Sequence, residues 1–365
     1  MHRSRKTGGT VVSFRSAANR GCEPWTTSGR HSPRPKARTG ARLKLDAIIA
    51  PVEGELKTFE RHFRRSLTSN VGLVDAVVRY MVKRKGKRIR PALVMLSAAA
   101  SGGIGDATYR GATLVELLHT ATLIHDDVVD DAETRRGWPS INAIWKNKLA
   151  VLLGDYVLSR GLLLSLEHND ISFLRSTSNA VKRMSEGELL QIQKSRQLRN
   201  DEETYFRIIS DKTASLLSTC CEIGAMSATG DDDVVARLRQ YGEYLGIAFQ
   251  IRDDILDFTG TQSMTGKPVG GDLKEKKFTL PLIHAFGNAP SSRRKNVLRH
   301  MKNGVKRKDI DDIIRFVEEF GGISYAVETA ESYRNRAKEE LNPLPDSDAR
   351  TALLQLADFV VSRKK

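Results

Sequence analysis

The chain lacks the features that would tie a protein together covalently or hold it in a membrane. It has only three cysteines in 365 residues, of which Cys22 stands alone, while Cys220 and Cys221 are adjacent, an arrangement in which cysteines rarely pair. Three such cysteines form no disulfide framework, so the composition is typical of a reducing compartment. No uninterrupted stretch of about 20 apolar residues occurs, and the sequence therefore predicts no transmembrane helix.

Strand-like alternation of apolar and polar residues is also scarce. From Leu45 onward, apolar residues instead recur three or four positions apart, as at 114, 117, 118 and 121 and again at 149, 152, 153 and 156. This is the spacing of buried helix faces. The pattern breaks at 101–105, 137–139, 196–203, 230–233, 259–272 and 287–293. No repeat of 20–50 residues is visible, and the chain is too long for a four-helix bundle. The sequence predicts one all-α domain of about ten or more helices.

Acidic residues are almost missing from residues 1–45, which hold eleven Lys and Arg against one Glu. The segment is rich in Ser, Thr and Gly and has no apolar period, a composition typical of an organellar transit peptide. We expect this extension to direct import into mitochondria and the folded domain to span 46–365. A disordered basic tail without an address, in the cytoplasm or another organelle, is the alternative. Nucleic-acid binding is disfavoured, because Phe14 and Trp25 are the segment's only aromatic residues for base stacking.

Two clusters of aspartate interrupt apolar helical segments, after ATLIH and after YLGIAFQI. Residues three or four positions apart share one face of a helix, so each DDxxD motif gathers like charges that destabilise it unless a cation is bound. Carboxylates suit Mg²⁺, which takes one or two of them together with waters and substrate phosphates. The predicted metal-binding residues are Asp126, Asp127 and Asp130 in the first cluster and Asp253, Asp254 and Asp257 in the second.

Other acidic runs indicate helix starts. Asp231, Asp232 and Asp233 follow Gly230 between two helical segments, so we expect a loop and a helix N-cap there. The group around Asp309 has the same pattern.

Basic residues lie close to both clusters in the sequence. Arg135 and Arg136 follow the first cluster at once, and a glycine-rich segment with lysines follows the second. Carboxylates, Mg²⁺ and nearby cations together form a site for a diphosphate, because guanidinium and ammonium groups make charge-assisted bonds to phosphate oxygens. The motifs of the candidate anion sites are GKRIRP at 86–91, Lys212–Thr213, GKP at 266–268 and Lys276–Lys277.

In these motifs the chain resembles the trans-isoprenyl diphosphate synthases, from about residue 46 to the C-terminus. The matching stretches are, in the family's order, GKRIRP, ELLHTATLIHDDVVDDAETRRG, VLLGDYVLSRG, EGELLQ, KTASL, GIAFQIRDDILDFTG and GKPVGGDLKEKKFTLPLI. The chain is most similar to the long-chain group that makes solanesyl-type side chains of ubiquinone. The resemblance implies an all-α isoprenoid synthase fold around a deep central cavity, with the two Asp-rich helices facing each other at its mouth. It also implies three Mg²⁺ ions and a homodimer, although a second, different subunit stays possible.

The resemblance also implies a role for each motif residue. Asp126, Asp130 and Asp253 would bind metal directly, and Asp127, Asp254 and Asp257 directly or through water. The allylic diphosphate would contact Arg135, Lys212, Gln250, Lys267 and Lys277. Isopentenyl diphosphate would contact Lys87, Arg90, His119 and Arg136, beside Phe249. Thr213 would lie near the reacting carbons, so that Lys212, Thr213 and Gln250 are the candidate catalytic residues. Lys276 stands where glycine is common in the family, which leaves open whether Lys276 or Lys277 reaches phosphate.

The implied reaction is a head-to-tail condensation of isopentenyl diphosphate with an allylic diphosphate. The allylic C–O bond ionises, the double bond of isopentenyl diphosphate attacks the carbocation, and the proton leaves to the departing diphosphate. A class I terpene cyclase is an alternative, disfavoured by the complete second DDxxD and by GKRIRP. A non-catalytic subunit of a heteromeric synthase is another, disfavoured because all the aspartates are present.

Product length depends on the helix that carries the first cluster. Ala121 and Thr122 precede Asp126 by five and four residues, which places them roughly 6–7.5 Å deeper along the same helix. Both side chains are small, so a growing chain could pass them, whereas short-chain members of the family have bulky residues here. The sequence therefore predicts products of eight to ten isoprene units, most often nine. Alternatively, Ala121 is small only to let two helices approach.

Overall fold

The computed structural model describes residues 44–365 apart from 84–85, 136, 199–200, 261–269 and 364–365. The predicted extension, Arg136 and Lys267 thus lie outside the described residues, and the boundary near residue 45 stays a prediction. Within the described part, regular structure is helical except for one short antiparallel hairpin, in which Arg135 pairs with Trp138. The prediction of an all-α domain with more than ten helices is confirmed.

The elements follow the chain in this order. The first half comprises α1 (Leu45–Ile48), η1 (Ala50–Val52), α2 (Glu53–Ser66), α3 (Gly72–Lys83), α4 (Ile89–Ser101), α5 (Asp106–Val129), β1 (Thr134–Arg135), β2 (Trp138–Pro139), α6 (Ile141–Glu167) and α7 (Ile171–Gln197). The second half comprises α8 (Glu202–Ile209), η2 (Ser210–Ala214), α9 (Ser215–Met226), α10 (Asp232–Thr259), α12 (Gly271–Lys274), α13 (Leu280–Asn288), α14 (Ser291–Lys302), α15 (Arg307–Glu319), α16 (Gly322–Glu340) and α17 (Asp348–Ser362).

Helix ends fall where turn and capping residues stand in the sequence. The four predicted breaks that the structure describes in full, at 101–105, 137–139, 230–233 and 287–293, fall at the ends of helices or at the hairpin. The side chain of Asp231 accepts hydrogen bonds from the backbone N–H groups of Asp233 and Val234, at 2.9 and 3.3 Å, as expected of an N-cap. Asp309 likewise accepts a bond from the N–H of Lys306 at the start of α15. Asp231 and Asp309 therefore bond to backbone groups at helix starts, as the sequence predicted.

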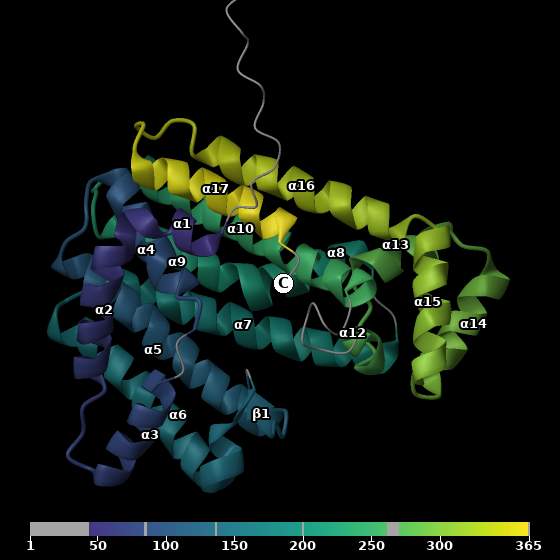
Figure 1. Cartoon of the computed structure of the whole chain (residues 1–365), viewed down its shortest axis with the longest axis horizontal. Coiled ribbons are helices and arrows are strands. Elements are labelled where there is room, and N and C mark those ends of the chain that lie inside the picture. The colour runs from purple at the N-terminus through teal and green to yellow at the C-terminus, as the bar shows by residue number, and fades with distance from the viewer. Residues whose placement is uncertain (1–43, 84–85, 136, 199–200, 261–269, 364–365) are drawn as a thin grey trace, which may run out of the picture. The chain divides into compact units, whose positions relative to one another are not determined.

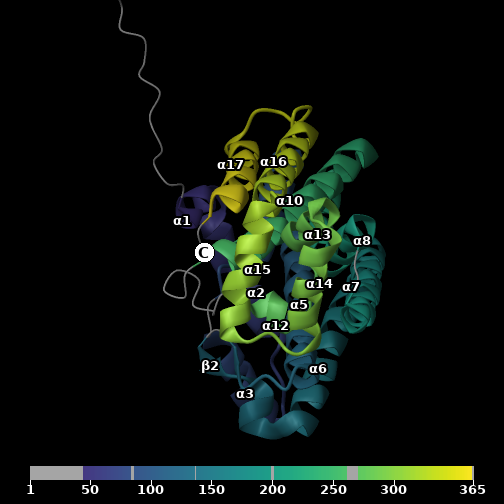
Figure 2. The same ribbon diagram turned by 90° about the vertical axis from the view of Figure 1, so that its right-hand side faces the viewer.

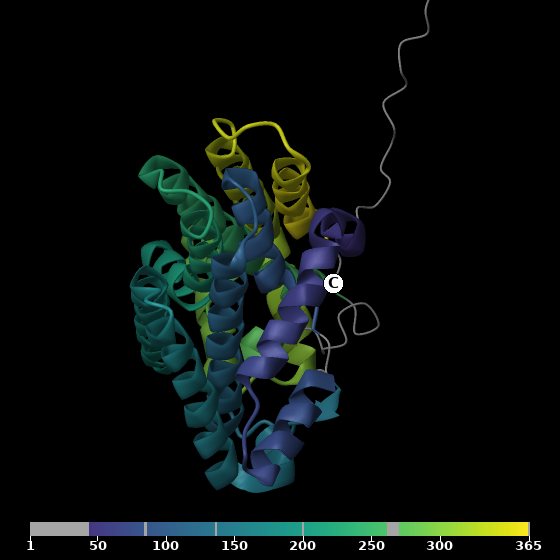
Figure 3. The ribbon, with the colours of Figure 1, turned by 90° about the vertical axis from the view of Figure 1, so that its left-hand side faces the viewer.

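The central helices are α4, α5, α9 and α10, with α6 packed along α5 and α16 along α10. Figure 1 shows α16 and α17 together along one side, and α14 and α15 together at the end opposite α1 and α2. The turned view in Figure 2 shows α7 and α8 side by side. From the opposite side, Figure 3 shows α2 lying along the helices coloured blue, in keeping with its contacts to α4 and α5. The two Asp-rich helices, α5 and α10, thus belong to the central layer.

Close helix packing in this layer depends on small residues. The predicted apolar face of α5 is buried, with Leu114, Leu117, Leu118 and Ala121 all at most 4% exposed. On α10, a Cβ at Gly246 would lie 2.4 Å from the Cα of Ala214. Protein interiors tolerate little overfilling, so glycine at this point lets α10 approach the segment Ser210–Ala214 closely.

Helix α6 is long and apolar enough, by length and composition, to cross a membrane, and it is the one described helix that meets this test. The prediction of no transmembrane helix had rested on uninterrupted runs, which α6 lacks. A single such helix is weak evidence for a membrane span, because the core helices of other proteins pass the same test. Several of its leucines are nevertheless exposed, Leu152 by 57%. One face of α6 therefore has no partner within the described chain.

Lys212 and Thr213 do not lie in a regular α-helix. They belong to η2, a π-helical turn between α8 and α9. Single π-turns are rare and frequently occur at functional sites, since they rotate side chains out of the α-helical register.

Candidate active site

The first aspartate cluster lies at the C-terminal end of α5. Asp126 and Asp130 are exposed, whereas Asp127 is 4% exposed and its Oδ1 accepts a hydrogen bond from Nε of Arg135 at 2.5 Å. Partial burial and the neighbouring charges of Asp130 and Glu188 raise the pKa of Asp126. The turn thus has the excess negative charge predicted from its sequence. Arg135, predicted to meet the allylic diphosphate, bonds to Asp127 in this structure.

In the second cluster, on α10, each aspartate has a different environment. Asp253 is partly exposed, and its Oδ1 accepts a hydrogen bond from Nη2 of Arg363 at 2.6 Å. The two oxygens of Asp257 accept bonds from the backbone N–H groups of Gly271 and Asp272, at 3.0 and 3.1 Å. Asp257 therefore anchors the start of α12 in this structure. A metal contact of Asp257 stays a prediction.

Asp254 is buried at 2% exposure and begins a chain of hydrogen bonds that ends at Thr213. Its oxygens accept bonds from the hydroxyl of Tyr205 at 2.6 Å and from Nε2 of Gln250 at 2.9 Å. The Oε1 of Gln250 in turn accepts a bond from the hydroxyl of Thr213 at 2.9 Å. Burial and the charge of Asp272 raise the pKa of Asp254 well above its ordinary value. Three predicted site residues are therefore connected, through bonds that fix the amide of Gln250.

A cavity of about 170 Å³ brings five predicted residues together between α7, η2 and α10. The predicted residues that line it are Lys212, Thr213, Gln250, Asp254 and Lys277. The lining also includes residues for which sequence analysis predicted no role, among them Gln191, Lys194, Tyr205 and Asp272. With three lysines and two carboxylates on its wall, the cavity is suited to an anion that also binds a metal.

Glu188 on α7 links the first cluster electrostatically to the lysines of the cavity. It forms an ion pair with Lys212 and lies within electrostatic reach of both Asp126 and Lys277. The Nζ of Lys212 also donates to Oε1 of Gln191 at 3.4 Å. Glu188 and Gln191 belong to the segment EGELLQ, so the sequence marked the segment but gave neither side chain a role.

Of the two adjacent lysines, Lys277 faces the cavity. It lines the cavity and forms ion pairs with Asp272 and Glu275. Lys276 instead has φ of 59°, in the left-handed region that glycine adopts without steric cost. Lys276 therefore has a strained backbone at a position where the family commonly has glycine. Because Lys277 lines the cavity, it is favoured over Lys276 as the phosphate ligand.

Two of the described residues predicted for isopentenyl diphosphate lie together at a second pocket. Lys87 and Phe249 line a mainly apolar pocket of about 50 Å³ together with Arg363. His119 is 8% exposed and Arg90 is partly buried, but neither lines this pocket.

Arg363 is a residue that sequence analysis missed. Its guanidinium lies 3.8 Å from the ring centroid of Phe249, donates to the carbonyl of that residue at 3.0 Å, and is 8% exposed. The sequence showed only a basic run after an amphipathic helix, and no local pattern indicates where such a terminus docks.

Ala121 and Thr122 are both in the interior part of α5. Ala121 is 2% exposed and belongs to a cluster with side chains of α3 and α6, such as Val77 and Leu153. Thr122 is partly buried, and its hydroxyl donates to the carbonyl of His119 at 2.9 Å. Neither residue lines the two cavities described above, so the predicted tunnel past Ala121 stays a prediction.

The described residues contain no group of three or more His, Cys, Asp or Glu that could hold a metal ion on its own. This agrees with the chemistry of Mg²⁺, which completes its shell with waters and substrate phosphates rather than with a protein cage. The solvent-reaching carboxylates of Asp126 and Asp130, with Asp253 on the other helix, are hard oxygen ligands of the right kind. The residues present therefore fit Mg²⁺ bound together with a diphosphate.

Fold and site together define a class of protein: an all-α enzyme whose two aspartate-bearing helices and lysine-lined cavity act on a diphosphate. The chain belongs to the polyprenyl synthetase family, which it matches over residues 71–319. It is thus a prenyltransferase of the polyprenyl diphosphate synthase class.

Relatives of known activity are similar over most of their length. The all-trans-nonaprenyl-diphosphate synthase (geranyl-diphosphate specific) of Rhodobacter capsulatus is 36% identical over 87% of this chain and 97% of its own. Heptaprenyl diphosphate synthase component 2 of Bacillus subtilis is 35% identical over 88% of this chain and 92% of its own. The polyprenyl synthase of Caulobacter crescentus, solved in complex with calcium and isoprenyl diphosphate, superposes with a TM-score of 0.81 at 33% identity, over 89% of this chain and all of its own.

Proposed function

We propose that the protein is an all-trans polyprenyl diphosphate synthase that depends on Mg²⁺ and makes a long-chain product of about nine units, for the side chain of ubiquinone. The observation that carries this proposal is the cavity in which Lys212, Thr213, Gln250, Asp254 and Lys277 meet. The relatives named for nonaprenyl and octaprenyl products support the long chain.

The cavity residues hold the allylic substrate. Lys212 and Lys277 neutralise its diphosphate from two sides, and the bonded pair Thr213–Gln250 lies where the first allylic carbons would be. Three Mg²⁺ ions, held by Asp126, Asp130 and Asp253 with the remaining aspartates in support, would supply further charge stabilisation for the leaving diphosphate. Cations already in place at this position favour ionisation of the allylic C–O bond, because they need no reorganisation during the reaction.

The second substrate is held beside the first. Lys87, Arg90 and His119, with Arg136, bind the diphosphate of isopentenyl diphosphate, and Phe249 lies next to its double bond. Phe249 immediately precedes Gln250 on α10, so the two substrates meet across one turn of this helix. The apolar walls around Phe249 keep water from the carbocation, and the proton leaves to the departing diphosphate.

The experiment uses purified protein, Mg²⁺, radiolabelled isopentenyl diphosphate and geranyl, farnesyl or geranylgeranyl diphosphate in turn. Chromatography of the dephosphorylated products should show chains of eight to ten units, with nine most abundant. Products of four units or fewer would contradict the long-chain assignment. Product formed without isopentenyl diphosphate would identify a terpene cyclase. Activity that requires a second protein would support a heteromeric synthase, as the name of the Bacillus relative suggests for that enzyme.

The metal sites are tested by changing one aspartate in each cluster. Asp126→Ala and Asp253→Ala should each lower turnover by about three orders of magnitude, since loss of metal-borne charge stabilisation removes roughly 4 kcal/mol from the transition state. Circular dichroism should show unchanged helical content. Asp311→Ala, the same change at an exposed position of α15, is the control and should keep full activity. Near-normal turnover in either cluster variant would overturn the two-cluster site.

We also propose that the enzyme is a homodimer formed through α6 and α7. Several apolar side chains on these helices are exposed and have no partner within the described chain. They are Val151, Leu152, Leu162, Leu163, Leu166, Leu189 and Ile192. Exposed apolar side chains in such number on two helices that contact each other are typical of a protein–protein interface. A second copy presents the same apolar face, so a two-fold interface would cover both.

We further propose that residues 1–45 direct the protein into mitochondria and that catalysis does not need them. A fluorescent reporter fused to these residues should enter mitochondria, and a variant with the eleven basic residues replaced by serine should stay in the cytosol. A reporter found in another compartment would exclude the mitochondrial address. Loss of activity in protein that starts at Leu45 would show that the segment contributes to catalysis.

A further inference from the structure

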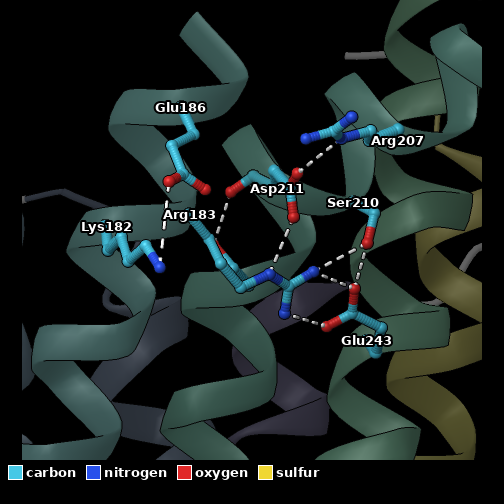
Figure 4. A network of polar contacts seen from close by, with 8 residues as sticks. Lys182, Arg183, Glu186, Arg207, Ser210, Asp211 and Glu243 are labelled. Carbon is cyan, nitrogen blue, oxygen red and sulfur yellow. Dashed lines mark hydrogen bonds and ion pairs between the residues drawn. The ribbon is translucent and has the colours of Figure 1, made fainter.

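Arg183 is a charged residue near the cavity that the reaction described above does not use. It lies on α7, and its guanidinium bonds to three residues on two other elements, as Figure 4 shows. Its Nε donates to Oδ1 of Asp211 at 2.8 Å, and its Nη2 donates to the hydroxyl of Ser210 at 2.8 Å and to Oε1 of Glu243 at 2.7 Å. Nη1 donates to the other oxygen of Glu243 at 3.2 Å. The planar fork of one guanidinium thus joins α7, η2 and α10.

Two of these partners are the first two residues of the π-turn. Ser210 and Asp211 open η2, and Lys212 and Thr213 follow directly. A π-turn is less stable than the α-helix on either side of it, so something must hold it in place. The ion pairs of Arg183 with Asp211 and with Glu243 bring opposite charges together at hydrogen-bond distance in a half-buried position. Such bidentate pairs are among the stronger side-chain interactions.

The face of α7 that carries Arg183 also contacts the rest of the turn. Gly187 is four residues further on, and a Cβ there would lie 3.0 Å from both the Cβ of Asp211 and the backbone nitrogen of Lys212. Gln191, four residues further again, accepts the bond from Lys212. Residues at intervals of four share a face of a helix, so Arg183, Gly187 and Gln191 together form the surface against which η2 rests.

The third partner connects the fork to the other wall of the cavity. Glu243 precedes Gln250 by seven residues, which is two turns of α10 and the same face. Gln250 bonds to Thr213, as described above. Arg183 therefore binds both the turn and the helix that the Thr213–Gln250 bond joins.

We infer that Arg183 is a positioning residue that sets the π-turn so that Lys212 and Thr213 face the allylic substrate. This inference rests on the proposed role of Lys212 and Thr213 in binding that substrate. Without Arg183, Asp211 keeps only its longer ion pair with Arg207, at 3.8 Å, and Glu243 keeps the hydrogen bond from the hydroxyl of Ser210. The junction of η2 and α10 then has two carboxylates and one cation fewer to balance them. The turn then shifts, and the cations of the cavity no longer meet the allylic diphosphate in the right place. The isopentenyl diphosphate site, on the Phe249 side of α10, keeps its geometry.

The test measures Arg183→Ala under steady-state conditions, with each substrate varied in turn. The expected result is a kcat lower by about a hundredfold, the effect of a misplacement of about 1 Å, with a higher KM for the allylic diphosphate. The KM for isopentenyl diphosphate should stay within twofold of that of the unchanged protein. Millimolar guanidinium ion should restore part of the activity, whereas ammonium ion at the same ionic strength should not.

Arg110→Ala is the matched control. Arg110 makes the same kind of forked pair, with Asp170 at 2.6 and 3.0 Å, but it precedes Asp126 by sixteen residues, about 24 Å along α5. This variant should lose thermal stability without the selective change in allylic KM. Asp211→Asn, which keeps the shape of the side chain, provides a second route and should change the same constants in the same direction by about tenfold.

The inference is overturned if Arg183→Ala keeps kcat and both KM values within twofold, or lowers kcat with both KM values unchanged, as a loss of folded protein would. Binding of inorganic diphosphate with Mg²⁺, followed by calorimetry, separates this outcome from failure of the proposed function. If the unchanged protein makes no product but binds diphosphate, Arg183→Ala should weaken that binding and Arg110→Ala should not. Equal binding in the two variants would overturn the role of Arg183.

Discussion

At the scale of single residues, other side chains of the protein bond to carboxylates of both clusters. Asp127 bonds to Arg135, Asp253 to Arg363 and Asp254 to Tyr205. Each of these bonds fixes the direction of an oxygen and balances part of the negative charge. The partners come from β1, the C-terminus and α8, three segments far apart in the sequence. Two chemically equal DDxxD motifs thus acquire different charge environments from their surroundings.

The roles of the adjacent lysines Lys276 and Lys277 can be compared by substituting each in turn. Lys277→Ala removes a charge-assisted bond and should raise the KM for the allylic diphosphate by about tenfold to a hundredfold. Lys276→Gly relieves the left-handed backbone at φ 59°, so activity should stay within twofold and the melting temperature should rise by on the order of 1 °C. Steady-state kinetics and thermal melts measure both. A larger loss of activity from Lys276→Gly than from Lys277→Ala would reverse the assignment.

The raised carboxyl pKa values predict how the stability of the metal-free protein depends on pH. Burial and the charge of Asp272 raise the pKa of Asp257 from 3.8 to about 6. A carboxyl whose pKa is higher in the folded than in the unfolded chain stabilises the fold fully below about pH 4, and this contribution is lost as the pH rises through 6. The stabilising contribution of Asp257 should therefore decrease between pH 5 and pH 7, and the melting temperature should decrease with it.

The comparison of wild-type protein with Asp257→Asn isolates this group. The difference in melting temperature between pH 5 and pH 7, measured with a chelator present, should be smaller in the variant, because asparagine does not titrate. Equal pH profiles for the two proteins would show that Asp257 is already ionised at pH 5.

At the scale of elements, α5 carries both the residues predicted to bind metal and those predicted to set product length. It carries Asp126 and Asp130 at its C-terminal end and Ala121 about five residues deeper, where the side chain is 2% exposed. Because α5 also packs along α6 and α7, a substitution at this level changes the space between helices rather than the metal site.

Ala121→Phe is predicted to shorten the product. An aromatic ring cannot be accommodated in close-packed surroundings without blocking the space next to it, so a tail that passes this level would stop at three or four isoprene units. Catalysis should be largely retained, since the aspartates lie a turn or more away. Product chromatography measures the shift, and Ala180→Phe, a buried alanine on α7, compares overfilling at another site. If Ala121→Phe stays active and makes products of unchanged length, Ala121 does not line the tunnel.

At the scale of the whole molecule, the exposed apolar side chains of α6 and α7 predict an assembly. Leu152→Glu combined with Leu163→Glu places charges on a face where both leucines are about half exposed. The double variant should sediment as a monomer while the wild-type protein sediments as a dimer, because burying an unpaired carboxylate in an apolar interface is costly.

The control for this assembly is a pair of glutamates away from the face. Arg299→Glu with Lys302→Glu, on the exposed surface of α14, changes the charge more but should leave the dimer intact. A wild-type protein that sediments as a monomer at micromolar concentration would contradict the homodimer.

The sequence by itself determined the helical architecture, the helix breaks and caps, and the chemistry of the two aspartate clusters. These features depend on residues within one or two helical turns of each other, where spacing dictates which side chains share a face. The resemblance of its motifs then extended the prediction to residues such as Lys212, Gln250 and Lys277, which the fold brings to one cavity.

Only the tertiary structure decided which charges meet. The π-turn at Ser210–Ala214 exists because α7 and α10 hold it from two sides, and local sequence there is compatible with an ordinary helix. Likewise, Arg363 reaches Asp253 across 110 residues, and Arg183 reaches Glu243 across 60. Contacts at such separations depend on how whole helices pack, and no pattern of neighbouring residues encodes that packing.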